Sequence, residues 1–415
     1  MRSWPSRALP SLIALFLAYG ALETPSAAAD QSGNSLAKEI ERLGADLRKL
    51  RQNHDKALQD IEKRLDRLKR RLPSEDQAIS GQEPKNLEAT ASESGPLPSP
   101  QPATVCGEGC EFTDLRAAIK AAESGGVITV APGLHGFCGV VDKPLTLRGL
   151  KDEAGKRAHL AGGVCMGKGP LVLQSSDIVI EGFEISNVAV SSRNGACIRI
   201  DPQAGDITIR DIYCHDSETG ILGGSGDGKI VVEDSLFERN GANKGRAHGI
   251  YIGKAESFEL RRSQVLSTKE KGHSLKSGAL TTIVEDSVLA ALDGENSRAI
   301  DAYGGGKLEV RRSVIQQGKN SDNHDAIGIA LQPKNVNPEP HETLVEDNWI
   351  IFDDLERCCR WLFRAKQFGP VIARDNQIVG MTDFAQSPLN TDMERNRLLK
   401  NRREAGLSAY DSTLG

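Results

Sequence analysis

The chain has 415 residues and a formal net charge of −5, with 26% charged and 38% hydrophobic residues. This length predicts two or three domains, and the near-neutral charge disfavours a nucleic-acid-binding protein, which needs a basic face. Glycine is abundant, at 42 residues, whereas aromatic residues make up only 4%. That combination favours a turn-rich fold over a helical bundle. Beyond the N-terminus no apolar run is long enough for a transmembrane helix, so we expect no membrane span in the mature chain.

The first 29 residues have the pattern of a secretory signal peptide. Arg2 and Arg7 supply positive charge, residues 8–22 are apolar, and residues 27–29 (Ala-Ala-Ala) offer a cleavage site before Asp30. An uncleaved anchor is the alternative, but the apolar stretch is short for one. We therefore expect an exported protein, either periplasmic or extracellular.

Eight cysteines follow the signal peptide, and an even number in an exported chain favours disulfide bonds. Buried thiols in a repeat core are the alternative. Cys106 and Cys110 are close enough to close one loop, whereas the adjacent Cys358 and Cys359 would pair with each other only under strain. No cysteine or histidine spacing is typical of a structural zinc site, and we assign no metal ligands.

Residues 30–72 are expected to form a coiled-coil helix. Apolar residues recur there at steps of three and four with a stutter at His54, namely Leu36, Ile40, Leu43, Leu47, Leu50, Leu58, Ile61, Leu65, Leu68 and Leu72. Such a segment predicts a homo-oligomer; a single amphipathic helix packed on the next domain is the alternative. Residues 73–104 are rich in Pro, Ser, Glu and Gln without periodicity, which predicts a disordered linker.

A repeat of short strands begins after a helix-like stretch, 115–123, that Thr113 or Asp114 would cap and Gly125-Gly126 would end. Each later strand alternates apolar and polar residues and then passes a polar bend. The bends lie 23 to 35 residues apart, at Asp211, Asp234, Arg262, Asp286, Arg312, Asp347 and Asp375. Solenoids have periods in this range. An antiparallel sandwich also has many short strands, but it does not need the same bend in every unit.

With its first helix, the VITVAPG strand and turn, and the repeated bend, region 105–385 resembles the right-handed parallel β-helix proteins of the pectin-lyase-like superfamily. The resemblance implies an all-β solenoid of roughly eight to ten coils, with an N-terminal capping helix that covers the open end of the stack. Proteins with this resemblance include lyases, hydrolases, epimerases and adhesins, so the resemblance does not determine the function. We expect the remaining residues, 386–415, to form a basic C-terminal helix and tail.

Three consecutive strands keep a constant spacing of 25 residues, which predicts two columns of polar side chains. The first column contains His248, His273, Arg298 and Asn323, and the second, three residues further on, contains Tyr251, Lys276 and Asp301. Equal steps in a parallel stack place equal positions about 4.8 Å apart. Alternation directs the second column outward, because the residues before it (Ile250, Leu275 and Ile300) should point inward. We therefore predict a surface patch of mixed charge; a solvated ladder or a buried histidine stack is the alternative.

These groups suit proton abstraction from C5 of a uronate, which needs a base, an acid and a cation for the neighbouring carboxylate. Lys276, whose positive neighbours should lower its pKa, is a candidate base, and Tyr251 is a candidate base or acid. His273 is a second candidate base, and Arg298 is a candidate ligand for the carboxylate. We assign His248, Asp301 and Asn323 to substrate binding. The resemblance to polysaccharide lyases and C5-epimerases implies the same division of labour.

The expected function is therefore that of a lyase or C5-epimerase acting on an anionic polysaccharide. A non-catalytic carbohydrate-binding or structural β-helix is the alternative. A glycoside hydrolase is less favoured because it needs close carboxylates, and the columns contain only Asp301. Residues 320–325 (NSDNHD) gather oxygen ligands without the spacing of an EF-hand, so calcium is left open as a cofactor.

Overall fold

A computed structural model describes residues 104–408, apart from 225, 339, 355, 357, 367–368 and 386–390. Contacts divide the chain into two units, Met1–Gly95 and Pro96–Gly415, and every described residue belongs to the second. The expected signal peptide, the coiled coil and all but the last residue of the linker lie outside the described residues. In the described part of the chain, no helix is both long enough and apolar enough to span a membrane.

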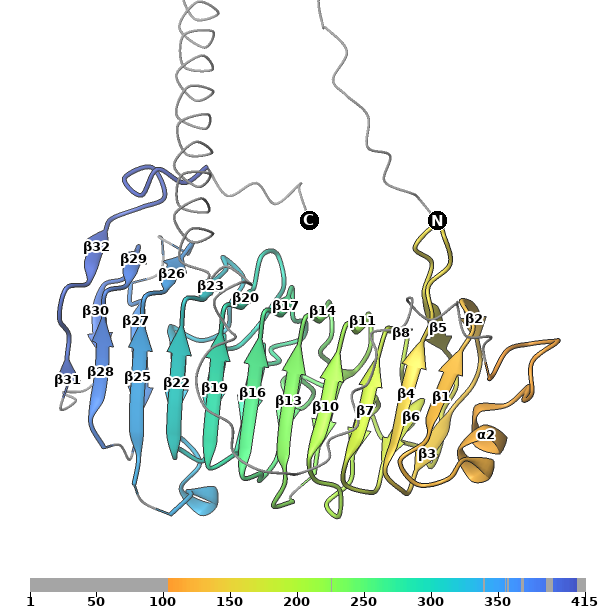
Figure 1. Ribbon diagram of the computed structural model, residues 1–415. Coiled ribbons are helices and arrows are strands. Elements are labelled where there is room, and N and C mark those ends of the chain that lie inside the picture. Colours follow the sequence, from red (N-terminus) through yellow and green to blue (C-terminus); the bar gives the residue numbers. More distant parts are fainter. Residues whose placement is uncertain are drawn as a thin grey trace, which may run out of the picture. The chain divides into compact units, whose positions relative to one another are not determined.

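Helix α2 (Leu115–Ala121) lies within the stretch where the sequence predicts a helix. Asp114 caps it, because its carboxylate accepts a hydrogen bond of 3.0 Å from the Arg116 backbone N–H. The helix lies beside the first coil in Figure 1, and its buried residues Leu115 and Ile119 belong to the main core. Both side chains approach Gly139 so closely that a Cβ at that position would clash with Ile119.

The chain then winds through three parallel sheets, called A, B and C (Figure 1). Sheet A contains β1 (Val127–Val130), β4 (Leu145–Gly149), β7 (Ile178–Glu181), β10 (Ile207–Arg210), β13 (Lys229–Glu233), β16 (Ser257–Arg261), β19 (Thr281–Glu285), β22 (Lys307–Arg311), β25 (Glu342–Glu346), β28 (Val371–Arg374) and β31 (Thr391–Asp392).

Sheet B contains β2 (Gly133–His135), β5 (Ala158–Ala161), β8 (Phe183–Ser186), β11 (Tyr213–His215), β14 (Leu236–Glu238), β17 (Gln264–Leu266), β20 (Val288–Ala290), β23 (Val314–Gln317), β26 (Trp349–Phe352), β29 (Gln377–Val379) and β32 (Arg397–Leu399). Sheet C contains β3 (Gly139–Val141), β6 (Leu171–Leu173), β9 (Ala196–Ile200), β12 (Thr219–Gly223), β15 (Ile250–Ile252), β18 (Leu275–Ser277), β21 (Ile300–Ala302), β24 (Asp325–Ile329), β27 (Trp361–Ala365) and β30 (Asp383–Ala385). A short 3-10 helix, η2 (Pro333–Asn335), follows β24. The all-β parallel solenoid expected from the sequence is confirmed.

The bends predicted from the repeat are the corners between sheets A and B. All seven bend residues have a left-handed backbone, with φ from 47° at Arg262 to 59° at Asp375. Aspartate tolerates this conformation better than most residues, which explains its frequency at the corners. The same torsion in successive coils gives every corner the same direction, so the strands on either side stay stacked.

The residue after each bend points inward and forms a ladder of hydrogen bonds from coil to coil. The Ser235 backbone N–H donates to Ser263 Oγ at 3.1 Å, and the Ser263 N–H donates to Ser287 Oγ at 3.1 Å. Asparagines continue the ladder: the Asn348 N–H donates to Asn376 Oδ1 at 3.0 Å. The ladder satisfies backbone donors that the corner would otherwise leave unpaired inside the protein.

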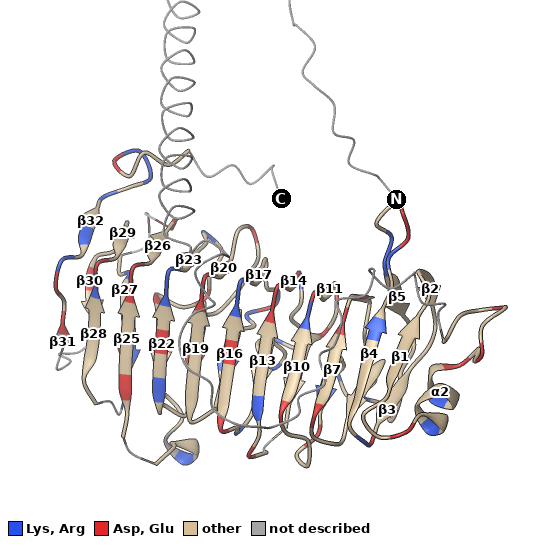
Figure 2. Ribbon diagram, in the orientation of Figure 1, with Lys and Arg blue, Asp and Glu red and all other residues tan. Residues whose placement is uncertain are grey.

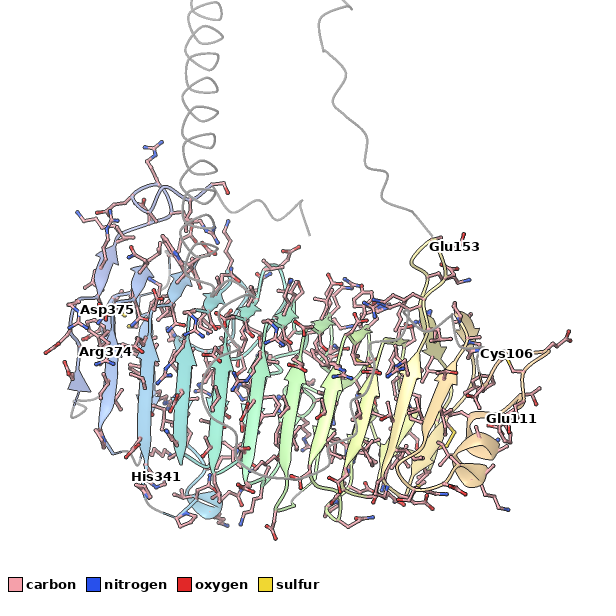
Figure 3. All side chains as sticks on the ribbon, in the orientation of Figure 1. Cys106, Glu111, Glu153, His341, Arg374 and Asp375 are labelled. Carbon is pink, nitrogen blue, oxygen red and sulfur yellow. A yellow bond between two sulfur atoms is a disulfide. The ribbon has the colours of Figure 1, made fainter. Side chains whose placement is uncertain are left out.

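The outward face of sheet A carries rows of opposite charges (Figure 2). Glu181 pairs with Arg148 at 2.5 Å and also with Arg210. Arg374, which is labelled in Figure 3, pairs with Glu346 at 2.6 Å. Like charges in neighbouring coils are thereby separated by a partner of opposite sign, which stabilises the register of the stack.

The expected C-terminal helix is wrong for the described residues beyond 390. Strands β31 and β32 there pair with β28 and β29 and add a further coil, so the β-helix continues to Leu399 rather than ending near 385. Asn396 extends the inward ladder by accepting from the Asn376 N–H at 3.1 Å, and Arg395 pairs with Asp375 at 2.7 Å. The basic residues thus lie at outward positions of a coil, and buried Leu399 faces the neighbouring strand.

Six of the eight cysteines form disulfides, Cys106–Cys110, Cys138–Cys165 and Cys197–Cys214, as the even count favoured. Cys358 and Cys359 are free thiols. The bond between Cys197 and Cys214 joins β9 to β11 inside the core, where both residues are fully buried.

Candidate functional site

The structure brings the two predicted columns together on sheet C. In the register of strands β15, β18 and β21, Tyr251 pairs with Lys276 and Lys276 pairs with Asp301. The preceding residues of these strands, Ile250, Leu275 and Ile300, are fully buried and point into the core, as alternation predicts. Constant spacing in the sequence therefore did translate into adjacency in space.

The two histidines of the first column stack on each other, with ring centres 5.2 Å apart and planes 16° from parallel. The His273 backbone N–H donates to His248 Nδ1 at 3.0 Å, and the Arg298 N–H donates to His273 Nδ1 at 3.2 Å. Because each Nδ1 accepts, each neutral ring carries its proton on Nε2. Burial lowers the pKa of His248 to about 3, and burial together with His248 and Arg298 holds the pKa of His273 well below its usual value. Both rings are therefore uncharged at neutral pH.

The expectation of a surface patch is wrong for four of its members. His248 and Asp301 are only 1% and 3% exposed, and His273 and Arg298 are also buried. The next coil has Gly328 in the Asp301 column, and the space over that glycine is filled by Leu331, Asp301 and the Arg298 side chain. Because this packing excludes water, the charged groups of Asp301 and Arg298 are desolvated at this point.

Arg298 is bound within the protein. Its Nε contacts Asp325 Oδ2, and its Nη2 donates to Asn323 Oδ1 at 3.2 Å. His273, just before β18, lies with its Nε2 3.2 Å from Oδ2 of Asp301 on the neighbouring strand β21. Burial raises the pKa of Asp301, and Arg298 and Lys276 oppose that shift. This network connects the first column to the second through buried polar contacts.

Lys276 and Tyr251 are half-buried, as is Asn323 at the end of the first column. Lys276 Nζ lies 5.2 Å from the ring centre of Tyr251 and 5.5 Å from that of Tyr303, within the range of cation–π contacts. Burial lowers the pKa of Lys276; Asp301 opposes this shift and Arg298 adds to it. The Tyr251 and Tyr303 rings lie edge to face with centres 6.0 Å apart, and burial is the main cause of the raised pKa of Tyr303. The pair therefore combines a partly desolvated amine with an accessible phenol.

Two residues near these columns, Tyr303 and Arg199, were not predicted from the sequence. Tyr303 lies beyond the regular spacing, two residues after Asp301. Arg199 lies in the same outward column as Tyr251, since both pair with Leu222 of β12. Arg199 Nε lies 3.8 Å from Asp201 and has no hydrogen-bond partner among the described residues. The steps from residue 199 to 222 and from 222 to 251 are unequal, so the constant interval did not reveal this arginine.

The oxygen-rich loop proposed for calcium is engaged with cationic side chains. Asp322 pairs with Lys271 at 2.8 Å, Asp325 pairs with Arg298, and Asn320 donates to the Asp293 carbonyl at 3.0 Å. Calcium binding here stays a prediction, which these contacts do not favour. A small hollow beside the loop is lined by Gln317, Gly318, Ser321, Asn323, His324, Phe352, Asp354 and Arg360.

Comparisons with known proteins agree with the fold. A family model described as "Right handed beta helix region" matches residues 164–321. An alginate lyase from Paenibacillus sp. str. FPU-7 is similar in structure, at 19% identity and a TM-score of 0.52, over 67% of this chain and 96% of that one. A pectin methylesterase from Aspergillus niger aligns at 10% identity and a TM-score of 0.34, over 72% of this chain and 90% of that one. A PL6 family alginate lyase aligns at 12% identity and a TM-score of 0.28, over 68% and 49%.

No curated protein matches the chain in sequence. The described region is thus a right-handed parallel β-helix, the fold of the pectin-lyase-like superfamily, as the sequence resemblance implied. Likeness at these identities establishes the fold and leaves the activity to be argued from the side chains.

Proposed function

We propose that the protein acts on an anionic, uronate-containing polysaccharide by proton transfer at C5, as a lyase or a C5-epimerase. The supporting observation is that Lys276 and Tyr251, adjacent in register on sheet C, are the half-buried pair in an otherwise buried charged cluster. A polar site that is partly closed to water and contains both an amine and a phenol suits acid–base chemistry.

Lys276 is the proposed base. Burial lowers its pKa, so more of the amine is neutral at a given pH and available to accept the C5 proton. In an elimination, the electrons left on C5 form the C4–C5 double bond, the C4–O bond breaks, and the Tyr251 hydroxyl protonates the leaving oxygen. In an epimerisation, the proton returns to C5 from the opposite face.

The proposed roles of the buried residues differ from those expected from the sequence. His273 and Arg298 are positioning residues, because their polar atoms are bound to Asp301, Asp325 and Asn323 within the protein. Asp301 raises the pKa of Lys276 and so partly offsets the lowering that burial causes in the proposed base.

Arg199 is the proposed ligand for a substrate carboxylate. It lies two strands before Tyr251 in the same outward column, a separation of roughly 9.6 Å at the usual strand spacing. The Arg199 side chain is 20% exposed, so a uronate can reach its exposed part for a charge-assisted hydrogen bond, while its buried Nε lies 3.8 Å from Asp201. The polysaccharide would then run along the column, with its reacting sugar over Lys276.

The test is an assay of the purified protein on a panel of uronate polysaccharides, followed by the ultraviolet absorbance of unsaturated products. Lys276→Ala and Lys276→Arg should each lower the rate by about 100- to 10,000-fold, because arginine keeps the charge but does not release its proton. Lys254→Ala is the matched control, since Lys254 is an exposed lysine just after β15. An unchanged rate in Lys276→Ala would refute the proposal, and activity in Lys276→Arg alone would show that Lys276 acts only through its charge.

A polysaccharide that is retained but gives no absorbance calls for a second assay. Solvent deuterium appearing at C5 of the recovered polymer would identify an epimerase. Retention without exchange would favour the alternative, a carbohydrate-binding module that uses the same face. The coiled coil, the export of the chain, the homo-oligomer and the capping role of α2 stay predictions.

A further inference from the structure

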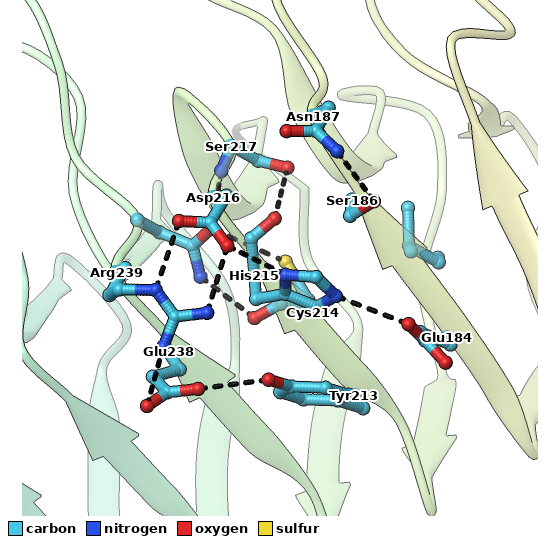
Figure 4. Close-up of polar contacts among 12 residues, drawn as sticks. Glu184, Ser186, Asn187, Tyr213, Cys214, His215, Asp216, Ser217, Glu238 and Arg239 are labelled. Carbon is cyan, nitrogen blue, oxygen red and sulfur yellow. Dashed lines mark hydrogen bonds and ion pairs between the residues drawn. The ribbon is translucent and has the colours of Figure 1, made fainter. Parts of the chain in front are cut away.

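A second cluster of ionisable side chains lies on the outward face of sheet B (Figure 4). His159 on β5 pairs in register with Glu184 on β8, and His215 on β11 pairs with Ser186, two residues further on. Glu184 Oε1 lies 3.3 Å from His215 Nε2 and 3.5 Å from His159 Nδ1. One ligand atom from each residue can be chosen so that all three lie within 4.8 Å of one another.

His215 lies between two carboxylates. Its Nδ1 is 2.8 Å from Asp216 Oδ2, and its Nε2 faces Glu184. Arg239 donates to both oxygens of Asp216, at 3.0 and 2.8 Å, so Asp216 is held as the acceptor for Nδ1–H. A neutral imidazole has a single N–H, and its other nitrogen then presents a lone pair toward Glu184. Two electron-rich atoms facing each other require a cation between them, either a second proton or a metal ion.

The surroundings also fix the orientation of both rings. His159 Nε2 is 2.8 Å from Ser186 Oγ, which directs its Nδ1 toward Glu184. The Tyr213 ring stacks on His215, with centres 4.3 Å apart, and its hydroxyl donates to Glu238 at 2.9 Å. Metal-bound histidines in proteins are commonly held in this way by a partner on the other ring nitrogen.

The two distances from Glu184 to the histidines fit the geometry of a tetrahedral metal site, and the two histidine nitrogens lie within 4.8 Å of each other. Zinc binds nitrogen and carboxylate oxygen at about 2.0–2.1 Å, which places two tetrahedral ligands roughly 3.3–3.4 Å apart. The two contacts of Glu184, at 3.3 and 3.5 Å, are close to that separation before any adjustment.

We propose that His159, Glu184 and His215 bind a divalent transition-metal ion of the zinc class, with Asp216 and Arg239 as the outer shell that orients His215. Two imidazoles with one carboxylate favour zinc, cobalt, nickel or copper over calcium and magnesium, which prefer oxygen. Three protein ligands leave one position open. The three side chains are 22%, 26% and 15% exposed, so water or an anionic group of a ligand can reach that position.

No pattern in the sequence indicates this site, and none of its residues was assigned as a metal ligand. Its ligands are 25 and 31 residues apart and form no local motif. The strand register alone brings them together. The site lies on sheet B, whereas the proposed proton-transfer pair lies on sheet C, so the two proposals can be tested independently of each other.

The test is a cobalt titration of the full chain, purified without a histidine tag and stripped with a chelator. Cys358→Ser and Cys359→Ser are introduced first, because free thiols would compete for the metal. We expect one cobalt ion per chain, with visible bands of a tetrahedral nitrogen–oxygen site that zinc displaces. Glu184→Gln and His215→Ala should each weaken binding by more than about 100-fold, and Asp216→Asn by about 10- to 100-fold. Glu184→Gln also keeps the shape of the side chain, so it separates ligand loss from misfolding.

His324→Ala is the matched control, because His324 is a half-buried histidine on the loop before β24, outside the cluster. Its affinity for cobalt should equal that of the parent. Binding that survives in both ligand variants, or that vanishes in the thiol-free parent, would overturn the proposal. Binding of calcium in preference to zinc would overturn the assigned metal class.

Discussion

Acid should destabilise the β-helix through His248, and replacing this residue should remove that part of the pH dependence. The ring is buried and neutral, with its Nδ1 accepting the His273 N–H. Its pKa is about 3 in the folded protein against 6.5 for an ordinary histidine. Since the folded pKa is the lower one, the unfolded chain binds the proton more tightly. The stabilising contribution is complete above pH 6.5 and is lost as the pH falls from 6.5 toward 3.

The size of the effect follows from the two pKa values. A difference of one unit corresponds to about 1.4 kcal/mol, so His248 contributes about 2 kcal/mol of destabilisation by pH 5 and about 4 kcal/mol by pH 3, where half of the folded protein is also protonated at this ring. The variant His248→Asn keeps an acceptor near the position of Nδ1 and does not titrate. It should be less stable than the parent at pH 7, because the smaller side chain leaves a cavity and loses the stacking with His273.

The measurement is the free energy of unfolding in urea at several pH values between 7 and 5, for the parent and for His248→Asn. Titrating groups remote from His248 are common to both proteins and cancel in the difference, and the change at His273, whose pKa His248 lowers, adds to the His248 effect being measured. We expect the gap between the two proteins to narrow by about 2 kcal/mol on going from pH 7 to pH 5. Parallel curves would refute the reasoning, because they would mean that His248 is protonated in the folded state as readily as in the unfolded one.

Two further predictions concern the core. Asn376→Ala should lower the free energy of unfolding by about 3–5 kcal/mol, because it leaves unpaired the groups that contact its amide, including the Val345 carbonyl at 2.9 Å and the Asn348 N–H at 3.0 Å. Ser287→Ala removes one accepted and one donated bond of the same ladder and should cost about half as much; equal losses in urea unfolding would contradict the ladder argument. Replacing both Cys197 and Cys214 by alanine should cost about 3 kcal/mol, from a closed loop with a sequence separation of 17. A midpoint in urea that is unchanged by the double replacement would contradict this estimate.

The sequence was sufficient for the solenoid and for the columns on sheet C. Bends such as Asp234 and Asp286 recur once in each coil, and a left-handed corner gives them a physical reason. In a parallel stack, an interval of 25 residues also determines which side chains are neighbours. Tyr251 and Lys276 therefore lie where the interval places them.

Burial at the same site could not be predicted, because it depends on residues outside the interval. Leu331 packs over Gly328 and Tyr303 packs over Gly278, and these glycines leave the room that the two larger side chains occupy. The proximity of His159 and His215 could not be predicted either, because the two coils that separate them in the sequence differ in length. Near the C-terminus, a basic segment fits a helix and the outward positions of a coil equally well, and contacts between distant residues, such as Arg395 with Asp375 and Asn396 with Asn376, decide between them.

The ladder of corners has a consequence for how the chain folds. Each coil contacts mainly the coils before and after it, and the corresponding bends are only 23 to 35 residues apart in a chain of 415. Short separations keep the entropic cost of each contact small, so winding can propagate from an existing coil to the next. The first coil lacks a preceding strand edge, and α2 with β1 is the part of the described chain that must form before winding can proceed from that end. If winding starts at this end, each later coil adds to a strand edge that the coil before it has already formed.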